Sequence, residues 1–241
     1  MKKISLLSGK GGTGKTTVAI GLSKYVNNSA LLDLDITAPD IPVYVKGEVQ
    51  LGDEGVIHPV ENDGIKYFSV GYLGDDPITW SSERIEDLIG ELFKEVAWGN
   101  TDYLFVDCPP GIAPEVQAIL PLVDATILVT NPTTLSYSDI KRTIELLKDE
   151  EVPIAGEIRN MAYYQCPNCG HTDHIFGYYQ NFTLEIPLIC EIPIVKMPGN
   201  LIPREFLPVE KILNAIKKPY AVKKIKQSKL KRYIIKRILE W

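Results

Sequence analysis

A glycine-rich segment near the start of the chain constrains the fold more than any other part of the sequence. It follows a short apolar run, Ile4 to Leu7, and fits the phosphate-binding pattern G-x-x-x-x-G-K-[ST] from Gly9 to Thr16. Glycine allows backbone angles at which several N–H groups point into one concavity, and a helix that begins there adds a dipole that favours an anion. The segment therefore predicts a strand, a phosphate-binding loop and a helix over residues 4–26.

Two side chains of this loop have predicted roles in binding a nucleotide such as ATP. The Lys15 ammonium supplies a positive charge to the outer phosphates, and the Thr16 hydroxyl is a ligand for Mg²⁺. Lys15 is therefore also a candidate catalytic residue. The residues that we expect to bind the nucleotide in this loop are Gly9, Gly11, Gly12, Thr13, Gly14, Lys15, Thr16 and Thr17.

The length and composition fit a single α/β domain of ordinary globular type. The chain has 241 residues, of which 45% are hydrophobic and 24% are charged. No stretch approaches the roughly 20 apolar residues that span a bilayer, and the first apolar run is too short for a signal peptide. We expect a cytoplasmic protein, in which the four cysteines are bound to metal or buried rather than disulfide-bonded.

Apolar runs typical of strands alternate with helical segments along the chain. Strands are predicted at residues 30–34, 103–106, 125–130 and 153–158, and helices at residues 85–96, 137–148 and 209–217. A β-hairpin is predicted at residues 55–73, with its turn at the sequence Asn-Asp-Gly. This alternation predicts a doubly wound, mostly parallel sheet flanked by helices.

Two acidic residues follow predicted strands close to the phosphate-binding loop. Asp107 ends a strand in the Walker B arrangement, which places a carboxylate beside Thr16 to hold Mg²⁺. Asp35 follows the strand at residues 30–34, at the edge where ligands bind in open α/β sheets. Asp35 is therefore a candidate for holding the hydration shell of Mg²⁺ or for orienting the attacking water, and the alternative is a solvated carboxylate in a turn.

A pair of cysteines marks a second candidate site. Residues 166–174 read Cys-Pro-Asn-Cys-Gly-His-Thr-Asp-His, and two thiolates at this spacing are half of a tetrahedral metal site. The chain has no second Cys-x-x-Cys, so two ways of completing the site stay open. Either His171 and His174 complete a zinc site within the chain, or two subunits each give Cys166 and Cys169 to a 4Fe-4S cluster or to zinc.

The loop contains a second lysine, Lys10, which phosphate binding does not require. The segment Lys-Gly-Gly-Thr-Gly-Lys-Thr resembles the deviant Walker A signature of the ATPase group that contains MinD, ParA, the nitrogenase iron protein and the Mrp/ApbC proteins. The resemblance implies that Lys10 is a catalytic residue that reaches across a dimer interface to the nucleotide of the partner subunit.

Other segments resemble the Mrp/ApbC proteins in particular, and together they cover roughly residues 1–215. Residues 33–42 are similar to Asp-x-Asp-x-x-x-Pro-x-x-Pro, residues 107–111 to Asp-x-Pro-Pro-Gly, and residues 160–177 to Asn-Met-Ser-x-Phe-x-Cys-Pro-x-Cys-Gly…Ile-Phe-Gly. The chain departs from the family after residue 111, where it reads Ile-Ala-Pro instead of Thr-Gly-Asp.

The Mrp/ApbC resemblance implies a homodimeric ATPase that binds a labile 4Fe-4S cluster at the dimer interface and passes it to apo-proteins. It also implies that the Gly111 N–H senses the terminal phosphate and that the Asn160 amide reads the edge of adenine, for which it offers a donor and an acceptor. The alternative function is a MinD/ParA-like switch for membrane or nucleoid positioning, with the cysteine pair as a structural zinc site. The cysteine pair favours the cluster carrier.

The C-terminal segment differs from the rest of the chain in charge. Residues 217–241 hold ten Lys or Arg and one acid, which gives them a net charge of +9. Since the whole chain has a net charge of −5, residues 1–216 carry −14. We predict an ATPase domain at residues 1–218, with the cysteine loop at 160–177, and a basic amphipathic helix at 219–241. We expect this helix to pack on the acidic body or a partner rather than on a membrane, and we expect no specific nucleic-acid binding.

Overall fold

The phosphate-binding loop follows a central strand of an eight-stranded sheet in the computed structural model, which describes residues 1–36, 38–74, 82–177, 184–195, 197 and 201–221. The strand order is β12-β9-β8-β1-β7-β2-β6-β5, and every neighbouring pair is parallel except β5 and β6. The strands of this sheet are β1 Lys2–Leu7, β2 Ser29–Asp33, β5 Val60–Asn62, β6 Ile65–Ser69, β7 Tyr103–Asp107, β8 Ala125–Thr130, β9 Ile154–Arg159 and β12 Leu188–Glu191.

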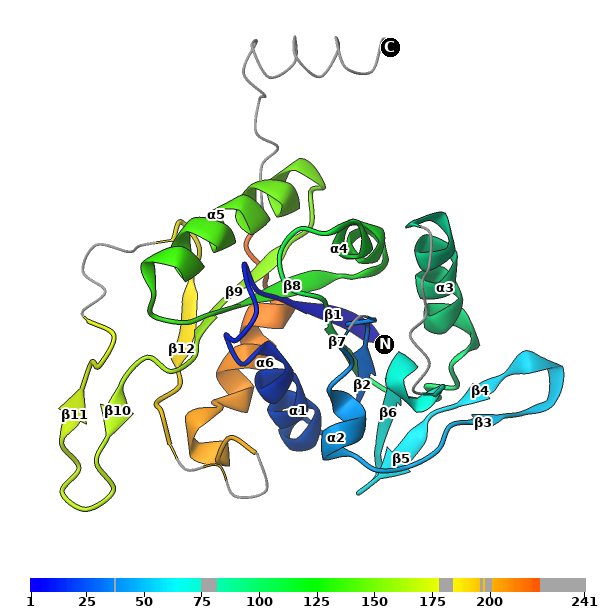
Figure 1. Ribbon diagram of the computed structural model, residues 1–241, viewed down its shortest axis with the longest axis horizontal. Helices are drawn as coiled ribbons and strands as arrows, with labels where there is room; N and C mark the ends of the chain where they lie inside the picture. Colours follow the sequence, from blue (N-terminus) through cyan, green and yellow to red (C-terminus); the bar gives the residue numbers. More distant parts are fainter. Residues whose placement is uncertain (37, 75–81, 178–183, 196, 198–200, 222–241) are drawn as a thin grey trace, which may run out of the picture.

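Helices cover both faces of the sheet, with α4 and α5 above it and α1 and α6 below it in Figure 1. The helices are α1 Lys15–Tyr25, α2 Ile41–Tyr44, α3 Ser82–Glu95, α4 Pro114–Ile119, α5 Thr134–Asp149 and α6 Val209–Lys217. Two small hairpins extend from opposite ends of the body: β3 Gln50–Leu51 with β4 Ile57–His58, and β10 Tyr164–Gln165 with β11 Thr172–Asp173. Among the described residues, none of the helices has the length and the apolar character that crossing a membrane would need.

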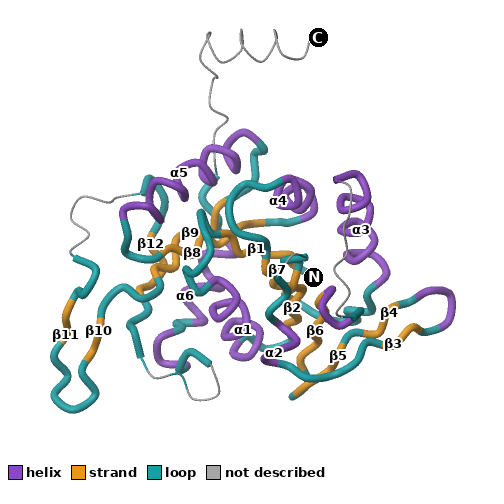
Figure 2. The backbone as a smooth tube through the Cα atoms, in the orientation of Figure 1, coloured by secondary structure: helices purple, strands orange, loops and turns teal. Residues whose placement is uncertain are grey.

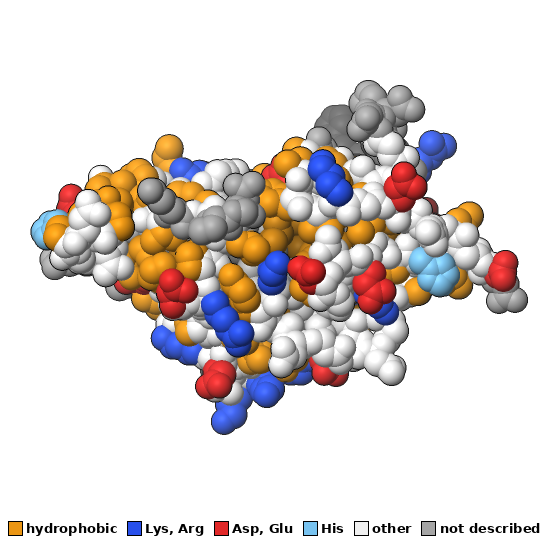
Figure 3. Space-filling view, turned by 90° about the horizontal axis from the view of Figure 1, so that it is seen from below, with side chains coloured by type: hydrophobic (Ala, Val, Ile, Leu, Met, Phe, Trp, Pro, Cys, Tyr) orange, Lys and Arg blue, Asp and Glu red, His pale blue; other side chains and the backbone are white. Residues whose placement is uncertain are grey.

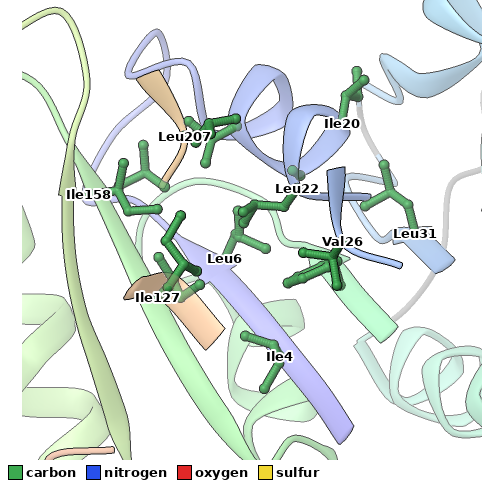
Figure 4. Close-up of a cluster of buried hydrophobic side chains, with 14 of the residues drawn as sticks. Ile4, Leu6, Ile20, Leu22, Val26, Leu31, Ile127, Ile158 and Leu207 are labelled. Atoms are coloured by element: carbon green, nitrogen blue, oxygen red, sulfur yellow. The ribbon is translucent and has the colours of Figure 1, made fainter. Parts of the chain in front are cut away.

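The two faces of the sheet carry separate apolar cores because neighbouring residues of a strand point to opposite sides. On β1, Ile4 and Leu6 pack with side chains of α1 (Figure 4) and belong to the same core as Ile212 and Ile216 of α6. Leu7 instead packs with side chains of α3, α4 and α5. On the face of α1 and α6, hydrophobic side chains also reach the surface between charged ones (Figure 3). Because both faces of the sheet are covered, the side chains on both sides of a strand are apolar. Each strand therefore appears in the sequence as a continuous apolar run.

The predicted doubly wound, mostly parallel sheet is confirmed, and the predicted hairpin corresponds to the antiparallel pair β5 and β6. The helix predicted to end before Pro219 is α6. The boundary of the predicted C-terminal helix is too early, because Tyr220 forms an antiparallel bridge with Ile154 of β9 and is extended. The rest of that prediction, residues 222–241, lies outside the described residues.

Gly156 in β9 offers a test of how the sheet is built beside the site. Its φ is +149°, and a Cβ at this position would lie 2.6 Å from the carbonyl oxygen of Pro187, just before β12. We expect Gly156→Ala to lower the free energy of unfolding by about 1–3 kcal/mol, because it forces backbone strain and separates β9 from β12. The measurement is urea unfolding followed by circular dichroism.

Gly90→Ala is the matched control, since beyond the adjacent residues and the nearby backbone of α3, no described atom lies within 4 Å of a Cβ added at this position. Alanine is favoured over glycine in a helix, so this variant should be as stable as the wild type or more stable by about 0.5–1 kcal/mol. Equal stability of Gly156→Ala and the wild type would contradict the close approach of the two strands.

Candidate functional site

The phosphate-binding loop joins the end of β1 to the first turn of α1 at the middle of the sheet (Figure 2). Gly14, which precedes α1, has a φ of 80°, in the left-handed region that favours glycine. Gly9 must be small for another reason, since a Cβ there would lie 2.5 Å from the backbone nitrogen of Ile140 in α5. The loop is therefore packed tightly between α1 and α5.

A pocket of about 320 Å³ lies beside this loop. The predicted site residues that line it are Lys10, Gly11, Gly12, Thr13, Gly14, Lys15, Thr16, Thr17 and Asp35. Asp40 and Tyr44, which lie at α2, also line the pocket and were not predicted. Gly9, Asp107 and Gly111 are not among the lining residues.

Lys15 and Thr16, which line the pocket, both bond the Asp107 carboxylate, which is buried behind them. The Lys15 Nζ lies 2.5 Å from one carboxylate oxygen of Asp107, and the Thr16 hydroxyl donates to the other at 2.6 Å. Burial lowers the pKa of a lysine, but here the adjacent Asp107 carboxylate outweighs it and raises the pKa of Lys15 above its usual value. The ion pair brings together the three side chains predicted to hold phosphate and Mg²⁺.

The Thr13 hydroxyl is a further polar group available to a ligand. Thr13 is 1% exposed, lines the pocket, and its Oγ1 has no hydrogen-bond partner among the described residues. Buried polar groups are normally paired, so an unpaired hydroxyl at a phosphate-binding loop fits a bound phosphate oxygen. The donor set of Lys15, Thr13 and Thr16, with the Asp107 carboxylate, is suited to a nucleotide with its magnesium ion.

Asp33 at the end of β2 is a buried carboxylate beside the site whose partners the sequence did not identify. It is fully buried, and its carboxylate accepts hydrogen bonds from the Asp35 N–H at 3.0 Å, from the Ser69 hydroxyl at 2.9 Å and from the Ile41 N–H at 3.4 Å. These bonds hold both ends of the segment that carries Asp35. The only signal in the sequence was the first Asp of Asp-x-Asp, which gives no indication of these partners.

A second, smaller cavity of about 150 Å³ shares Gly14 and Thr17 with the first. Asn160, directly after β9, lines it together with mostly apolar residues: Met161, Ile192, Pro193, Ile194, Val195, Met197 and Ile202. The Asn160 Nδ2 donates to the Thr13 carbonyl at 2.9 Å. An apolar slot with one amide, next to a phosphate pocket, has the character of a site for a nucleobase.

Two predicted residues have partners within the chain that the sequence did not indicate. The Lys10 Nζ donates to the Thr133 hydroxyl at 3.1 Å, at the start of α5. The Gly111 N–H donates to the Ser8 carbonyl at 2.9 Å. The action of Lys10 across a dimer and the phosphate sensing by Gly111 stay predictions.

Cys166 and Cys169 lie in the turn that joins β10 to β11, at one end of the body (Figure 1). The turn is closed by hydrogen bonds from the Cys166 N–H to the His171 carbonyl at 2.8 Å and from the Gly170 N–H to the Cys166 carbonyl at 2.9 Å. Backbone N–H groups of Cys169 and Asn168 lower the pKa of Cys166, which favours the thiolate that binds metal.

Within the described part of the chain, no group of three or more Cys, His, Asp or Glu residues could hold a metal ion. His171 is exposed, and the His174 ring nitrogen lies 3.2 Å from the Ala162 carbonyl. Burial raises the pKa of Cys108 above its usual range and that of Cys190 to about 12, which disfavours the thiolate form of both. Among the described residues, Cys166 and Cys169 thus form a pair without a third ligand, and both ways of completing the site stay predictions.

The fold and the first pocket define a P-loop NTPase, in which a central parallel strand leads into the phosphate-binding loop and the neighbouring strand ends in the Walker B carboxylate. Residues 1–200 match the family described as ParA: NUBPL iron-transfer P-loop NTPase, and the chain belongs to this family.

The chain is 38% identical over 188 residues to the iron-sulfur cluster carrier protein of Methanocaldococcus jannaschii. The match covers 73% of this chain and 65% of the relative, so the chain spans just under two thirds of its length. A nucleotide-binding protein from Archaeoglobus fulgidus, solved in complex with ADP, is 28% identical with a TM-score of 0.65, over 90% of this chain and 88% of that one. MinD from Pyrococcus horikoshii, 22% identical over 90% and 95% of the two chains with a TM-score of 0.59, shares the fold.

Asp33 gives a prediction for stability in the absence of nucleotide and Mg²⁺. Burial, together with the Asp107 carboxylate, raises the pKa of Asp33 from 3.8 to about 7. Between these values the folded state binds more protons than the unfolded state, so the free energy of unfolding falls as the pH rises. Urea unfolding between pH 4.5 and 6.5 should show this fall, and one such group contributes at most about 1.4 kcal/mol per pH unit.

Asp33→Asn removes the ionisable group and should make the dependence on pH shallower than in the wild type. Asp53→Asn, a change at an exposed carboxylate, should leave the slope of the wild type unchanged. The same slope for Asp33→Asn and the wild type would show that Asp33 is already ionised throughout this range.

Proposed function

We propose that the chain is an ATP-hydrolysing carrier of 4Fe-4S clusters that works as a homodimer and delivers the cluster to apo iron–sulfur proteins. One observation carries the proposal: a single chain joins a P-loop nucleotide site to a pair of cysteines, one half-buried and one exposed, that lacks further ligands among the described residues. The similarity to a relative named iron-sulfur cluster carrier protein supports this combination.

In this proposal the first pocket binds the phosphates of ATP and the second cavity binds its adenine. Lys15, Thr13 and the loop N–H groups bind the phosphates, while Thr16 and Asp107 hold Mg²⁺. The magnesium ion neutralises charge on the phosphates. Asp35 orients the attacking water from the segment that Asp33 holds in place, and Lys10 stabilises the charge on the phosphates from the partner subunit.

The cluster is the cargo of the protein rather than a permanent part of it. A 4Fe-4S cluster takes four thiolates, and two chains that each give Cys166 and Cys169 supply this number. Exposure of the turn allows an acceptor to reach the cluster. Apolar side chains beside the turn support a contact with a second subunit, since Ile175 and Phe176 are 55% and 50% exposed.

The nucleotide site and the cysteine turn are connected through shared backbone. The chain runs from Asn160 through residues 161–163, the stem of the cysteine hairpin, into β10. Ile192 and Ile194 line the second cavity, named the base cavity from here on, and are hydrogen-bonded to this stem. The Ala162 N–H donates to the Ile192 carbonyl at 2.9 Å, and the Ile194 N–H donates to the Tyr163 carbonyl at 2.7 Å. A movement of the residues that line the base cavity would therefore be transmitted to the cysteines.

Anaerobic reconstitution with iron and sulfide tests the cargo. We expect a brown dimer with about four irons per two chains. Cys166→Ser or Cys169→Ser should abolish the colour, because each change leaves the dimer with two thiolates instead of four. Absorbance, iron analysis and size-exclusion chromatography under nitrogen provide the measurement.

Cys190→Ser is the matched control, since this thiol lies on β12 outside the cysteine turn, and its variant should load iron like the wild type. A colourless protein that retains stoichiometric zinc at Cys166 and Cys169 would contradict the proposal and would favour a structural metal site.

Hydrolysis of ATP is tested separately with Asp35→Ala. If Asp35 orients the attacking water, its loss should lower kcat by about 10² or more, as for other groups that assist proton transfer, while the Kd for ATP changes little. Steady-state phosphate release and equilibrium titration with ATP measure the two quantities. Asp53→Ala is the control at an exposed carboxylate, and equal kcat values for the two variants would show that Asp35 has no part in the reaction.

A further inference from the structure

A buried network of charges lies at the carboxyl ends of β8, β9 and β12. The Arg159 guanidinium bonds both carboxylate oxygens of Glu157, each at 3.2 Å, and also bonds Glu191 at 2.8 Å. Glu157 further accepts hydrogen bonds from the Thr130 hydroxyl at 2.6 Å and from the Tyr137 hydroxyl of α5 at 3.1 Å. The network therefore joins three strands and one helix.

Neither Arg159 nor Glu191 lines the base cavity, but each is followed by a residue that does. Asn160 follows Arg159, and Ile192 follows Glu191. A backbone hydrogen bond joins the ends of β9 and β12 at these residues, since the Ile192 N–H donates to the Arg159 carbonyl at 2.8 Å. Because neighbouring residues of a strand point to opposite sides, the Arg159 side chain lies toward α5 while Asn160 contacts the phosphate-binding loop.

The burial of this network distinguishes it from the ion pairs at the surface. Glu157 and Arg159 are 1% and 8% exposed, so each needs the other to offset the loss of water. Well-packed apolar residues could often give equal stability at such a position, whereas a bidentate arginine fixes the geometry of the groups around it. The arrangement is thus better suited to setting the distance between strands than to adding stability.

The residues that directly follow β9 and β12 supply most of the lining of the base cavity. The Asn160 NH₂ group is engaged with the Thr13 carbonyl, and no described residue donates to the Asn160 amide oxygen. An amide oxygen at this position accepts a hydrogen bond from the amino group of adenine and not from the carbonyl group of guanine.

We propose that Arg159, with Glu157 and Glu191, is the positioning unit that gives the site its preference for adenine. Through the backbone, it holds Asn160 and Ile192 on either side of the base. The inference rests on the proposed function in taking a nucleoside triphosphate as the ligand and the second cavity as the site of its base, and it concerns recognition of the base rather than hydrolysis or cluster transfer.

Binding measurements on the full-length protein with three ligands test the inference: MgATP, MgGTP and magnesium triphosphate, which has no base. The variant Glu191→Ala removes the bond between Arg159 and β12 but keeps the buried pair of Arg159 and Glu157. Calorimetric titration should show a Kd for ATP raised about tenfold, a smaller ratio of ATP to GTP affinity, and an affinity for triphosphate within twofold of the wild type.

Glu185→Ala is the matched control, because it removes an equal charge just before β12, at a glutamate that is 88% exposed and paired with Lys148 at 3.6 Å. It should bind all three ligands like the wild type. Arg159→Lys keeps the buried charge and loses the two-pronged contact with Glu157, so it should reproduce the pattern of Glu191→Ala in a folded protein.

Equal losses for ATP and triphosphate in Glu191→Ala would overturn the inference and show a general structural role. Unchanged ratios among the three ligands would overturn it as well. A wild-type protein that binds none of the ligands would instead contradict the proposed function, so the two failures are distinguishable.

Discussion

The buried ion pair of Lys15 and Asp107 is the interaction on which the site depends. It ties the first residue of α1 to the last residue of β7, and β7 is in register with β1 so that Leu6 lies opposite Asp107. Loss of one partner would leave a buried charge, at a cost of about 3–5 kcal/mol. In the proposed function, phosphate and Mg²⁺ engage these same two groups, so nucleotide binding replaces one internal ion pair with two contacts to the ligand.

The parallel sheet brings the remaining parts of the site to one edge, since the carboxyl ends of its strands meet there. Asp33, which bonds the segment carrying Asp35, is the last residue of β2. The Walker B carboxylate is the last residue of β7, and Asn160 comes directly after β9. The end of β12 serves two structures at once, because it forms the wall of the base cavity and is bonded to the stem of the cysteine hairpin. This shared element offers a physical route by which a nucleotide influences the cargo.

Much of this arrangement could be predicted from the sequence because it depends on local patterns. The run at residues 125–130 is β8 residue for residue. Gly11, Gly12 and Gly14 line the first pocket, and Asp107 accepts a hydrogen bond from Thr16. The bond of Asp33 with Ser69 and that of Arg159 with Glu191 could not be predicted, since these partners lie 36 and 32 residues away in the sequence. The contact of Lys10 with Thr133 also spans most of the domain.

The central claim is that the cysteine pairs of two chains carry a cluster that can be handed on. Its most direct test is transfer: the anaerobically loaded protein is mixed with the apo form of a dehydratase that requires a 4Fe-4S cluster, in the presence of an iron chelator. We expect dehydratase activity to recover with the loaded protein and not with an equal amount of free iron and sulfide. No recovery, or recovery equal to that with free iron and sulfide, would contradict the claim.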